Sequence, residues 1–433
     1  MIRKSSVVVL MVVLIGCLST GLAFAGGKQE TVATATKPAS SAVKFWWYDM
    51  INQPIYVSLA NQFEKKTGIH INLQGYAGWG TMHQKEMLAV AGGNAPDAAI
   101  EKPLNMPDLA SRGALMNLGP YIQKAGLSKD TWFKVQIGYD SIYNGKIYDL
   151  PFWMASEAFL INQTLFQKAG FNPNDPPKTW SQAVADAKKM TNASSGIYGL
   201  MVNAYGSNDP NPFMMIAAED GAHMFTTKND HPVINVDSPQ AIQALQFLYD
   251  VIYKYKVAPP PGTMSEQLAF NQRVGMWVDN NDVVPNLRKL APDVNYESAV
   301  MPAGTVNNVA IEMSASLDEF AHAKNPQAAF KWIEYLSTNR QNQIKFAQAT
   351  GLFPSMPSAV SDPAFSGPHL GGWQKIAETQ DFTPRPVALG GPQIYQDIGD
   401  AVQAVLTKKE TPAQALKIAQ KQIDAVLSNP ATS

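Results

Sequence analysis

The chain has 433 residues, of which 45% are hydrophobic and 16% are charged. This composition excludes a disordered chain and a coiled coil, and a prior of roughly 150 residues per domain suggests two or three domains. The 34 Lys and Arg residues nearly balance the 35 Asp and Glu residues, so no basic excess favours a nucleic acid as partner.

The first residues have the pattern of an export signal. Arg3 and Lys4 precede an unbroken apolar run, residues 7–15, which is too short to span a bilayer as a helix. Ala23-Phe24-Ala25 fits cleavage by ordinary signal peptidase, which predicts a signal peptide over residues 1–25. We therefore expect an exported protein.

A second cleavage signal lies upstream of the first, and the two cannot both be used. Residues 14–17 (LIGC) resemble a bacterial lipoprotein box, in which Cys17 would carry a lipid anchor at the outer face of the membrane. Residues 26–42 are mostly small and polar, which predicts a flexible tether. Cys17 is the single cysteine of the chain, so the body has no disulfide and no thiol nucleophile.

The body begins with a strand, a helix and a second strand. Residues 43–47 are rich in β-branched and aromatic side chains, which is typical of a strand. Residues 54–67 repeat apolar side chains every four positions, as in an amphipathic helix, and residues 69–73 alternate apolar with polar side chains, as in a strand. A right-handed crossover unit of this length builds a parallel sheet. A further strand is predicted near residues 96–100 and a helix near 106–111.

The rest of the chain continues to alternate strand-like and helical segments. These segments are residues 159–161, 180–190, 197–202, 241–253 and 273–278. Asn325-Pro326 and Thr411-Pro412 then begin two amphipathic helices. Two α/β lobes, each a mostly parallel sheet flanked by helices, are the simplest architecture.

Catalytic motifs are largely missing from the sequence. The six histidines include no pair at the i, i+4 spacing of a helix-borne zinc site, and we expect neither a metal nor a cofactor. Gly75, Gly78 and Gly80 do not follow the order of a dinucleotide-binding loop. Carboxylates are plentiful, but sequence gives no separations, so a secreted glycan-cleaving enzyme stays open at this point.

Aromatic side chains stand beside amides and carboxylates at predicted strand ends. They are Trp46, Trp47, Tyr48, Trp79, Trp153 and Trp277, the last followed by the polar run 279–282. Ligands of open α/β sheets bind at the carboxyl ends of strands, and flat rings beside amides suit a sugar. The alternative is that these tryptophans fill the core.

Several short motifs follow one another between residues 43 and 427 in an order that is known from other proteins. They are residues 92–97 (GGNAPD), 144–151 (NGKIYDLP), 159–170 (FLINQTLFQKAG), 179–180 (TW), 273–277 (RVGMW), 325–336 (NPQAAFKWIEYL), 351–354 (GLFP) and the helix 412–427. Together they resemble the bacterial extracellular solute-binding proteins of the family 1 type, which are sugar-receptor subunits of ATP-binding-cassette (ABC) importers and include the maltose-binding protein.

This resemblance implies a two-lobe periplasmic-binding-protein fold of type II, with the ligand cleft between the lobes. The first lobe would hold residues 43–151 and about 302–354, and the second 152–301 and about 355–433. The protein would be a monomer without catalytic activity that captures a sugar by hinge closure and delivers it to a membrane permease. A phosphorylated or anionic metabolite is the alternative ligand, and it would need Lys102 and Arg385 to face the cleft.

The resemblance also maps a ligand site onto this sequence. Its residues are Trp47, Tyr48, Trp79, Asp97, Trp153, Glu157, Tyr205, Asn208, Asp209, Trp277, Asn280, Asn281, Glu312 and Arg385. Ala155 stands where the family often has a polar or acidic residue, which is a departure from the pattern. We expect the main stacking contacts from Trp47, Trp79 and Trp277, and orientation of the ligand from Asn280.

Overall fold

The computed structural model describes residues 42–48, 53–202, 209–228, 231–263, 265–365, 367 and 369–428. They belong to one compact unit, residues 40–433. The predicted signal peptide, Cys17 and all of the predicted tether except Ala42 lie outside the described residues. In the part of the chain that the structure describes, every helix is too short or too polar to cross a membrane.

The first lobe is built on the predicted strand, helix and strand. Strand β1 pairs in parallel with β2 on one side and with β3 on the other, with Phe45 opposite Leu73 and Ala98. The elements of this region are β1 (Ala42–Tyr48), α1 (Gln53–Thr67), β2 (His70–Tyr76), α2 (Trp79–Ala91), β3 (Ala98–Glu101), α3 (Met106–Ser111), α4 (Gly119–Lys124), β4 (Ile142–Tyr143) and β5 (Lys146–Ile147). The crossover unit predicted from the alternating pattern is confirmed.

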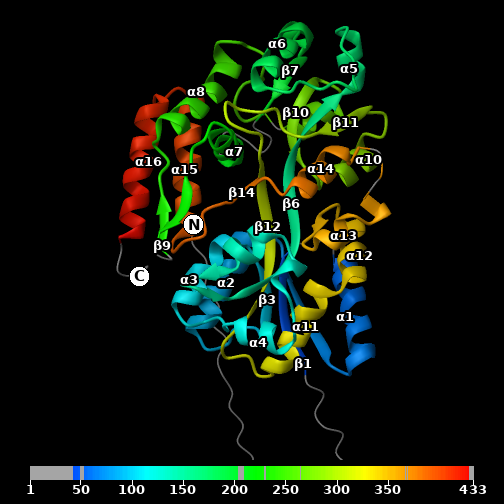
Figure 1. The fold of residues 1–433 in the computed structure, drawn as a ribbon, viewed down its shortest axis with the longest axis vertical. Coiled ribbons are helices and arrows are strands. Elements are labelled where there is room, and N and C mark those ends of the chain that lie inside the picture. Colours follow the sequence, from blue (N-terminus) through cyan, green and yellow to red (C-terminus); the bar gives the residue numbers. More distant parts are fainter. Residues whose placement is uncertain are drawn as a thin grey trace, which may run out of the picture. The chain divides into compact units, whose positions relative to one another are not determined.

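Two long strands connect the lobes. Strands β6 (Asp149–Asn162) and β12 (Ala310–Glu319) pair antiparallel and run side by side from the region of β1 and β3 to the region of β7 and β10 (Figure 1). The short strand β14 (Phe382–Thr383) pairs with the start of β12.

The second lobe extends the same sheet. The end of β6 pairs with β10 and β11, and β10 pairs with β7. The elements of this region are α5 (Gln163–Lys168), α6 (Trp180–Met190), β7 (Tyr198–Met201), α7 (Asn211–Glu219), β8 (Phe225–Lys228), β9 (His231–Ile234), α8 (Pro239–Tyr253), α9 (Ser265–Phe270), β10 (Val274–Asn280), α10 (Val283–Leu290) and β11 (Tyr296–Ala299).

The last part of the chain covers both lobes. Helix α11 packs its buried Trp332 against Phe45 and Phe63 of the first lobe, with ring centroids 5.7 and 5.2 Å apart. Helices α15 and α16 contribute Ile398 and Leu416 to the core of the second. The elements here are α11 (Pro326–Thr338), α12 (Arg340–Thr350), β13 (Phe353–Pro354), α13 (Pro357–Val360), α14 (Gly371–Thr379), α15 (Gly391–Leu406) and α16 (Pro412–Leu427).

The sheets are mixed rather than mostly parallel. Strands β1, β2 and β3 pair in parallel, and so do β7 and β10. The two long strands pair antiparallel with each other, and β12 pairs antiparallel with β3 and β6 with β10. The physical reason is that each long strand runs against the strands of the lobe that it enters.

Gly199 lies where α6 packs against β7. A Cβ atom at this position would overlap the backbone of Ala187. We expect Gly199→Ala to lower the free energy of unfolding by about 1–3 kcal/mol, because overpacking forces the helix away from the sheet. Urea denaturation measures this change. Gly80→Ala is the matched control, since no atom lies within 4 Å of its added Cβ, and an equal loss there would contradict the explanation.

Candidate functional site

A cavity opens where the carboxyl ends of β1, β3 and β10 meet the two long strands. Its volume is about 220 Å³, a little below the roughly 300–1,000 Å³ typical of sites for drug-sized ligands. Its lining residues are Tyr48, Tyr56, Trp79, Lys102, Trp153, Ala155, Asn280, Asp282, Met313, Ser314, Phe346, Thr350, Leu352 and Arg385. They come from both lobes and from the strands between them, which is the place predicted for the cleft.

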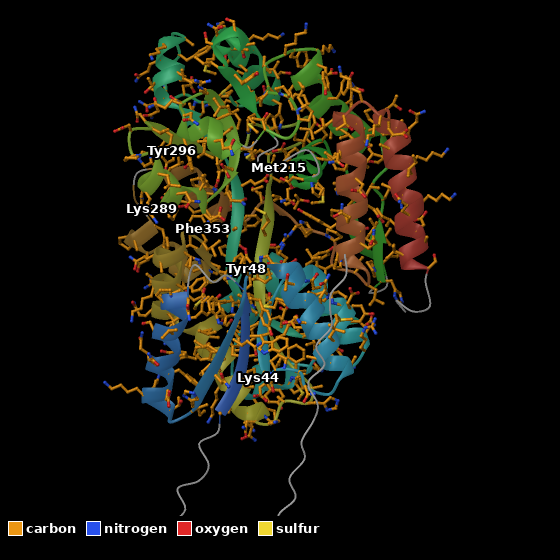
Figure 2. All side chains as sticks on the ribbon, turned by 180° about the vertical axis from the view of Figure 1, so that it is seen from behind. Lys44, Tyr48, Met215, Lys289, Tyr296 and Phe353 are labelled. Carbon is orange, nitrogen blue, oxygen red and sulfur yellow. The ribbon has the colours of Figure 1, made fainter. Side chains whose placement is uncertain are left out.

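Strand ends determine which side chains reach the cavity. Tyr48 is the last residue of β1 and Asn280 the last residue of β10, while Lys102 follows β3 directly. Figure 2 shows Lys44 and Tyr48 toward opposite ends of β1, with Tyr48 at the end nearer the second lobe. Since parallel strands present their carboxyl ends at the same edge, residues that are far apart in sequence meet there.

An aromatic wall forms one side of the cavity. The rings of Tyr48 and Trp79 stack with centroids 4.1 Å apart and planes inclined by 26°. Trp153 on β6 lies next to them, with its centroid 6.2 Å from that of Trp79. All three rings are only partly buried. A wall of this kind presents flat apolar area to a ligand that carries C–H faces.

The facing side of the cavity is polar. The side-chain oxygen of Asn280 is shielded from solvent and accepts no hydrogen bond from any described residue. Arg385, which follows β14, brings a guanidinium to the same cavity. The stacking rings were expected from both lobes, but the aromatic side chains at the cavity come from the first lobe and from β6, so a ligand would be stacked from one side only.

The two cations of the cavity have different surroundings. Burial, and then the charge of Arg385, lower the pKa of Lys102 to about 8, and Glu101 partly opposes this shift. The Lys102 Nζ atom lies 5.4 Å from the centroid of the Trp79 ring, which is a cation–π distance. Above pH 8 most Lys102 side chains are therefore neutral, and they attract an anion only weakly.

Buried carboxyl groups surround Arg385. Burial is the main cause that raises the pKa of Asp140, Glu157 and Glu312, and raises that of Asp209 to about 6. The charge of Arg385 lowers the pKa of all four groups. Asp209, with a pKa of about 6, is ionised at neutral pH and supplies negative charge to the surroundings of Arg385.

Asp149 on β6 makes the stability depend on pH. Burial raises the pKa of Asp149 to about 7. The folded state therefore binds more protons than the unfolded chain between about pH 4 and pH 7, and stability falls as pH rises through this window, by up to about 1.4 kcal/mol per pH unit.

Asp149→Asn isolates this effect, because the amide has nearly the shape of the protonated acid and does not ionise. We expect the variant and the parent to have similar unfolding free energies at pH 5 and the variant to be the more stable at pH 8. Urea denaturation at both pH values measures the difference. A parent that becomes more stable than the variant on going to pH 8 would contradict the raised pKa.

Five of the residues predicted for the site line this cavity. They are Tyr48, Trp79, Trp153, Asn280 and Arg385. Lys102, named for the anionic alternative, also lines it. Tyr205 and Asn208 lie outside the described residues.

Two tryptophans expected to stack on a ligand lie in the core instead. The exposed fraction is 1% for Trp47 and 0% for Trp277. Trp47 packs on Tyr56 with centroids 4.5 Å apart, and the indole N–H of Trp277 donates to Asp279 at 3.2 Å. Helices cover both faces of each sheet, so rings in the body of a strand are buried on either face.

Asp97 and Asn281 have structural partners. The carboxylate of Asp97 accepts backbone N–H groups of Lys44 and Lys324 at 2.7 and 2.6 Å, which holds β1 to the loop before α11. The Asn281 side chain accepts the N–H of Ser156 at 3.1 Å and donates to the carbonyl of Gly351 at 2.7 Å. Neither residue lines the cavity.

Glu157, Asp209 and Glu312 lie behind the polar wall rather than on it. All three are buried, and none is among the lining residues. Gln136 donates to Glu312 at 3.2 Å. The charge of Arg385 lowers the pKa of each group, so they lie near that side chain, while their predicted contact with ligand stays a prediction.

Other lining residues were not predicted from the sequence. Phe346, Thr350 and Leu352 reach the cavity from α12 and the loop after it, and Tyr56 from α1. The helical side chains carry ordinary amphipathic spacing, so no signal separated them from core residues. Asp282 lies in the polar run 279–282 that follows Trp277, and this run was the one sequence feature that pointed to a lining residue among them.

Comparisons with known proteins find a family model, relatives and solved structures that match most of this chain. The family model described as bacterial extracellular solute-binding protein matches residues 58–371. A putative binding protein of Brucella abortus is 24% identical over 88% of this chain and 91% of its own length. The maltotriose-binding protein of Pyrococcus abyssi is 22% identical over 79% of this chain and 72% of its own.

Solved structures show the same fold. An ABC substrate-binding protein of Listeria monocytogenes in complex with cycloalternan has a TM-score of 0.77 at 22% identity, covering 89% of this chain and 99% of its own. The sugar-binding protein MalE of Xanthomonas citri has a TM-score of 0.78 at 20% identity, covering 90% and 98%. The two-lobe α/β fold expected from the sequence is confirmed.

Proposed function

The chain belongs to the family of bacterial extracellular solute-binding proteins, and on this premise we propose that it binds a neutral sugar or short oligosaccharide for an ABC importer. The observation that carries the proposal is the cavity between the lobes. There the partly exposed rings of Tyr48, Trp79 and Trp153 face the unpaired side-chain oxygen of Asn280. Rings take up the C–H faces of a sugar, and the amide accepts a hydroxyl.

The relatives support a carbohydrate ligand. One is named for maltotriose, another from Bacillus subtilis for arabinooligosaccharides, and a structural neighbour is a complex with cycloalternan. A relative from Rhizobium meliloti is named for sn-glycerol-3-phosphate. Lys102 and Arg385 do reach the cavity, as such an anion would require, but the lowered pKa of Lys102, about 8, and the aromatic wall favour the neutral ligand.

Hinge closure is the mechanism that fits this cavity. A sugar stacked on the first lobe would leave its other hydroxyl groups in water until Asn280 and Arg385 of the facing wall approach. Closure of this kind is known for periplasmic binding proteins. Micromolar affinity corresponds to about −8 kcal/mol, and a closed state populated at about 1% without ligand costs roughly 2.7 kcal/mol of it.

The family and the neighbours are binding proteins rather than enzymes. We expect this chain to release its ligand unchanged to the permease subunits of an importer, to act as a monomer, and to be exported after cleavage behind Ala25. A lipid anchor on Cys17 is the alternative form of attachment. The lobe boundaries near residues 151, 302 and 354 stay predictions.

A panel of neutral sugars and oligosaccharides tests the proposal by thermal shift, with sn-glycerol-3-phosphate as the anionic comparison. A ligand at a hundred times its Kd stabilises the protein by about 2.7 kcal/mol. The same sugar should reduce the radius of gyration in solution scattering and should be recovered intact. Stabilisation by the anion and by no carbohydrate would overturn the proposal.

A further inference from the structure

A histidine and two glutamates meet between α2 and the end of β3. His83 and Glu86 lie one turn apart on α2, and Glu101 is the last residue of β3. One nitrogen of the histidine and one oxygen of each carboxylate all lie within 4.8 Å of one another. The parallel pairing of β1 with β2 and β3 brings the helix and the strand end together.

The separations suit a single metal ion. The Nδ1 atom of His83 is 3.3 Å from Oε2 of Glu101 and 3.9 Å from Oε2 of Glu86. Ligand atoms at about 2.1 Å from a tetrahedral ion lie about 3.4 Å from each other. The three atoms lie within 4.8 Å of one another, so a bound ion would draw the wider pairs closer.

In the part of the chain that the structure describes, Glu86 has no partner outside this cluster, and within it the carboxyl group lies close enough to Glu101 to share a hydrogen bond. The exposed fraction of Glu86 is 0%, and neither carboxylate oxygen accepts a hydrogen bond from any described residue. Burial, followed by the charge of Glu101, raises its pKa well above the usual value. Two buried carboxylates side by side are costly unless a cation or a proton lies between them.

Hydrogen bonds fix the orientation of the Glu101 carboxylate. Its Oε1 atom accepts the backbone N–H of Lys102 and the side-chain N–H of Asn105, both at 2.7 Å. These bonds leave Oε2 directed at His83. Outer hydrogen bonds that orient a carboxylate are typical of metal sites.

The donor set selects the metal. One imidazole nitrogen with two carboxylates favours a transition metal such as Zn²⁺ over Ca²⁺ or Mg²⁺, which prefer oxygen ligands alone. The side chain of His83 is 15% exposed, which leaves a route from solvent and a coordination position for water. We propose that His83, Glu86 and Glu101 bind one Zn²⁺ ion or a similar divalent transition metal.

The expectation of no metal rested on helix spacing alone. His83 and Glu86 are separated in sequence from Glu101, so only the fold joins them. The site also lies next to the cavity, because Trp79 precedes His83 by one turn of α2 and Lys102 follows Glu101. The proposal nevertheless stands independently of the proposed sugar ligand.

Zinc titration of the untagged, chelator-treated protein tests the site. We expect calorimetry to show one equivalent of Zn²⁺ bound and the thermal midpoint to rise by about 3 °C at a hundred times Kd. Glu86→Gln should weaken zinc binding on the order of 100-fold. His70→Gln, which alters an exposed histidine 2.9 Å from Glu64, is the matched control and should bind like the parent.

Circular dichroism checks that Glu86→Gln folds, and His83→Asn provides the same readout if it does not. Mg²⁺ and Ca²⁺ at the same concentration should produce a smaller midpoint shift than Zn²⁺. Zinc binding that is equally strong in the parent, Glu86→Gln and His83→Asn would overturn the proposal. A parent that binds no zinc while Glu86→Gln melts higher would assign the cluster to a shared proton instead.

Discussion

Replacing Trp277 with alanine should lower the free energy of unfolding by about 3–5 kcal/mol. The ring is fully buried in the core between β10, β11 and α14. It packs against Tyr296 with centroids 6.4 Å apart and donates its N–H to Asp279 at 3.2 Å. Alanine removes both contacts and leaves a cavity that the rigid sheet closes only in part. Urea denaturation measures the loss.

Trp277→Phe serves as the control, because it keeps an aromatic ring and should lose less stability than alanine. Ligand affinity should stay nearly unchanged in both variants wherever they are folded, since the ring does not line the cavity. If Trp277→Ala instead kept its stability and lost its ligand, the ring would belong to the binding site and its placement in the core would be wrong.

Trp79→Ala should have the opposite result, with a large loss of affinity and little loss of stability. Trp79 is partly exposed at the start of α2 and stacks on Tyr48. Its ring offers apolar area that only a bound ligand would cover, and losing it should cost about 1.5–3 kcal/mol of binding, or roughly 10–100-fold in Kd. Calorimetry with the sugar identified in the thermal-shift panel measures this change.

Trp79→Phe tests whether stacking is the cause, because a smaller ring should recover part of the affinity. Trp153→Ala should weaken binding in the same direction, since its ring extends the same wall. Unchanged sugar affinity in Trp79→Ala would contradict the aromatic wall, whereas an equal loss of affinity and of stability would place the ring in the core.

Local sequence patterns identified many elements closely. The predicted strand at residues 43–47 is β1 (Ala42–Tyr48), and the predicted helix at 180–190 is α6 (Trp180–Met190). The capping sequence Thr411-Pro412 begins α16, where Thr411 and Gln414 form a reciprocal cap. Such features depend on neighbours a few residues apart, so they are readable without knowledge of the fold.

Alternation along a strand could not separate cavity residues from core residues. Trp46 and Trp47 point to opposite faces of β1, and both are buried, because each face carries an apolar cluster. Only Tyr48, at the end of the strand, reaches the cavity. In β10 likewise, Trp277 in the body of the strand is buried in the core, whereas Asn280 at its end lines the cavity.

The sequence by itself determined the order of strands and helices, the family and the kind of residue at the strand ends, because short-range periodicity and motif order carry that information. Tertiary structure alone decided which side chains share a cavity, which carboxyl groups lie near Arg385 and that His83 meets Glu101. These outcomes depend on where strands end and how helices cover the sheet, and on contacts between segments far apart in the chain.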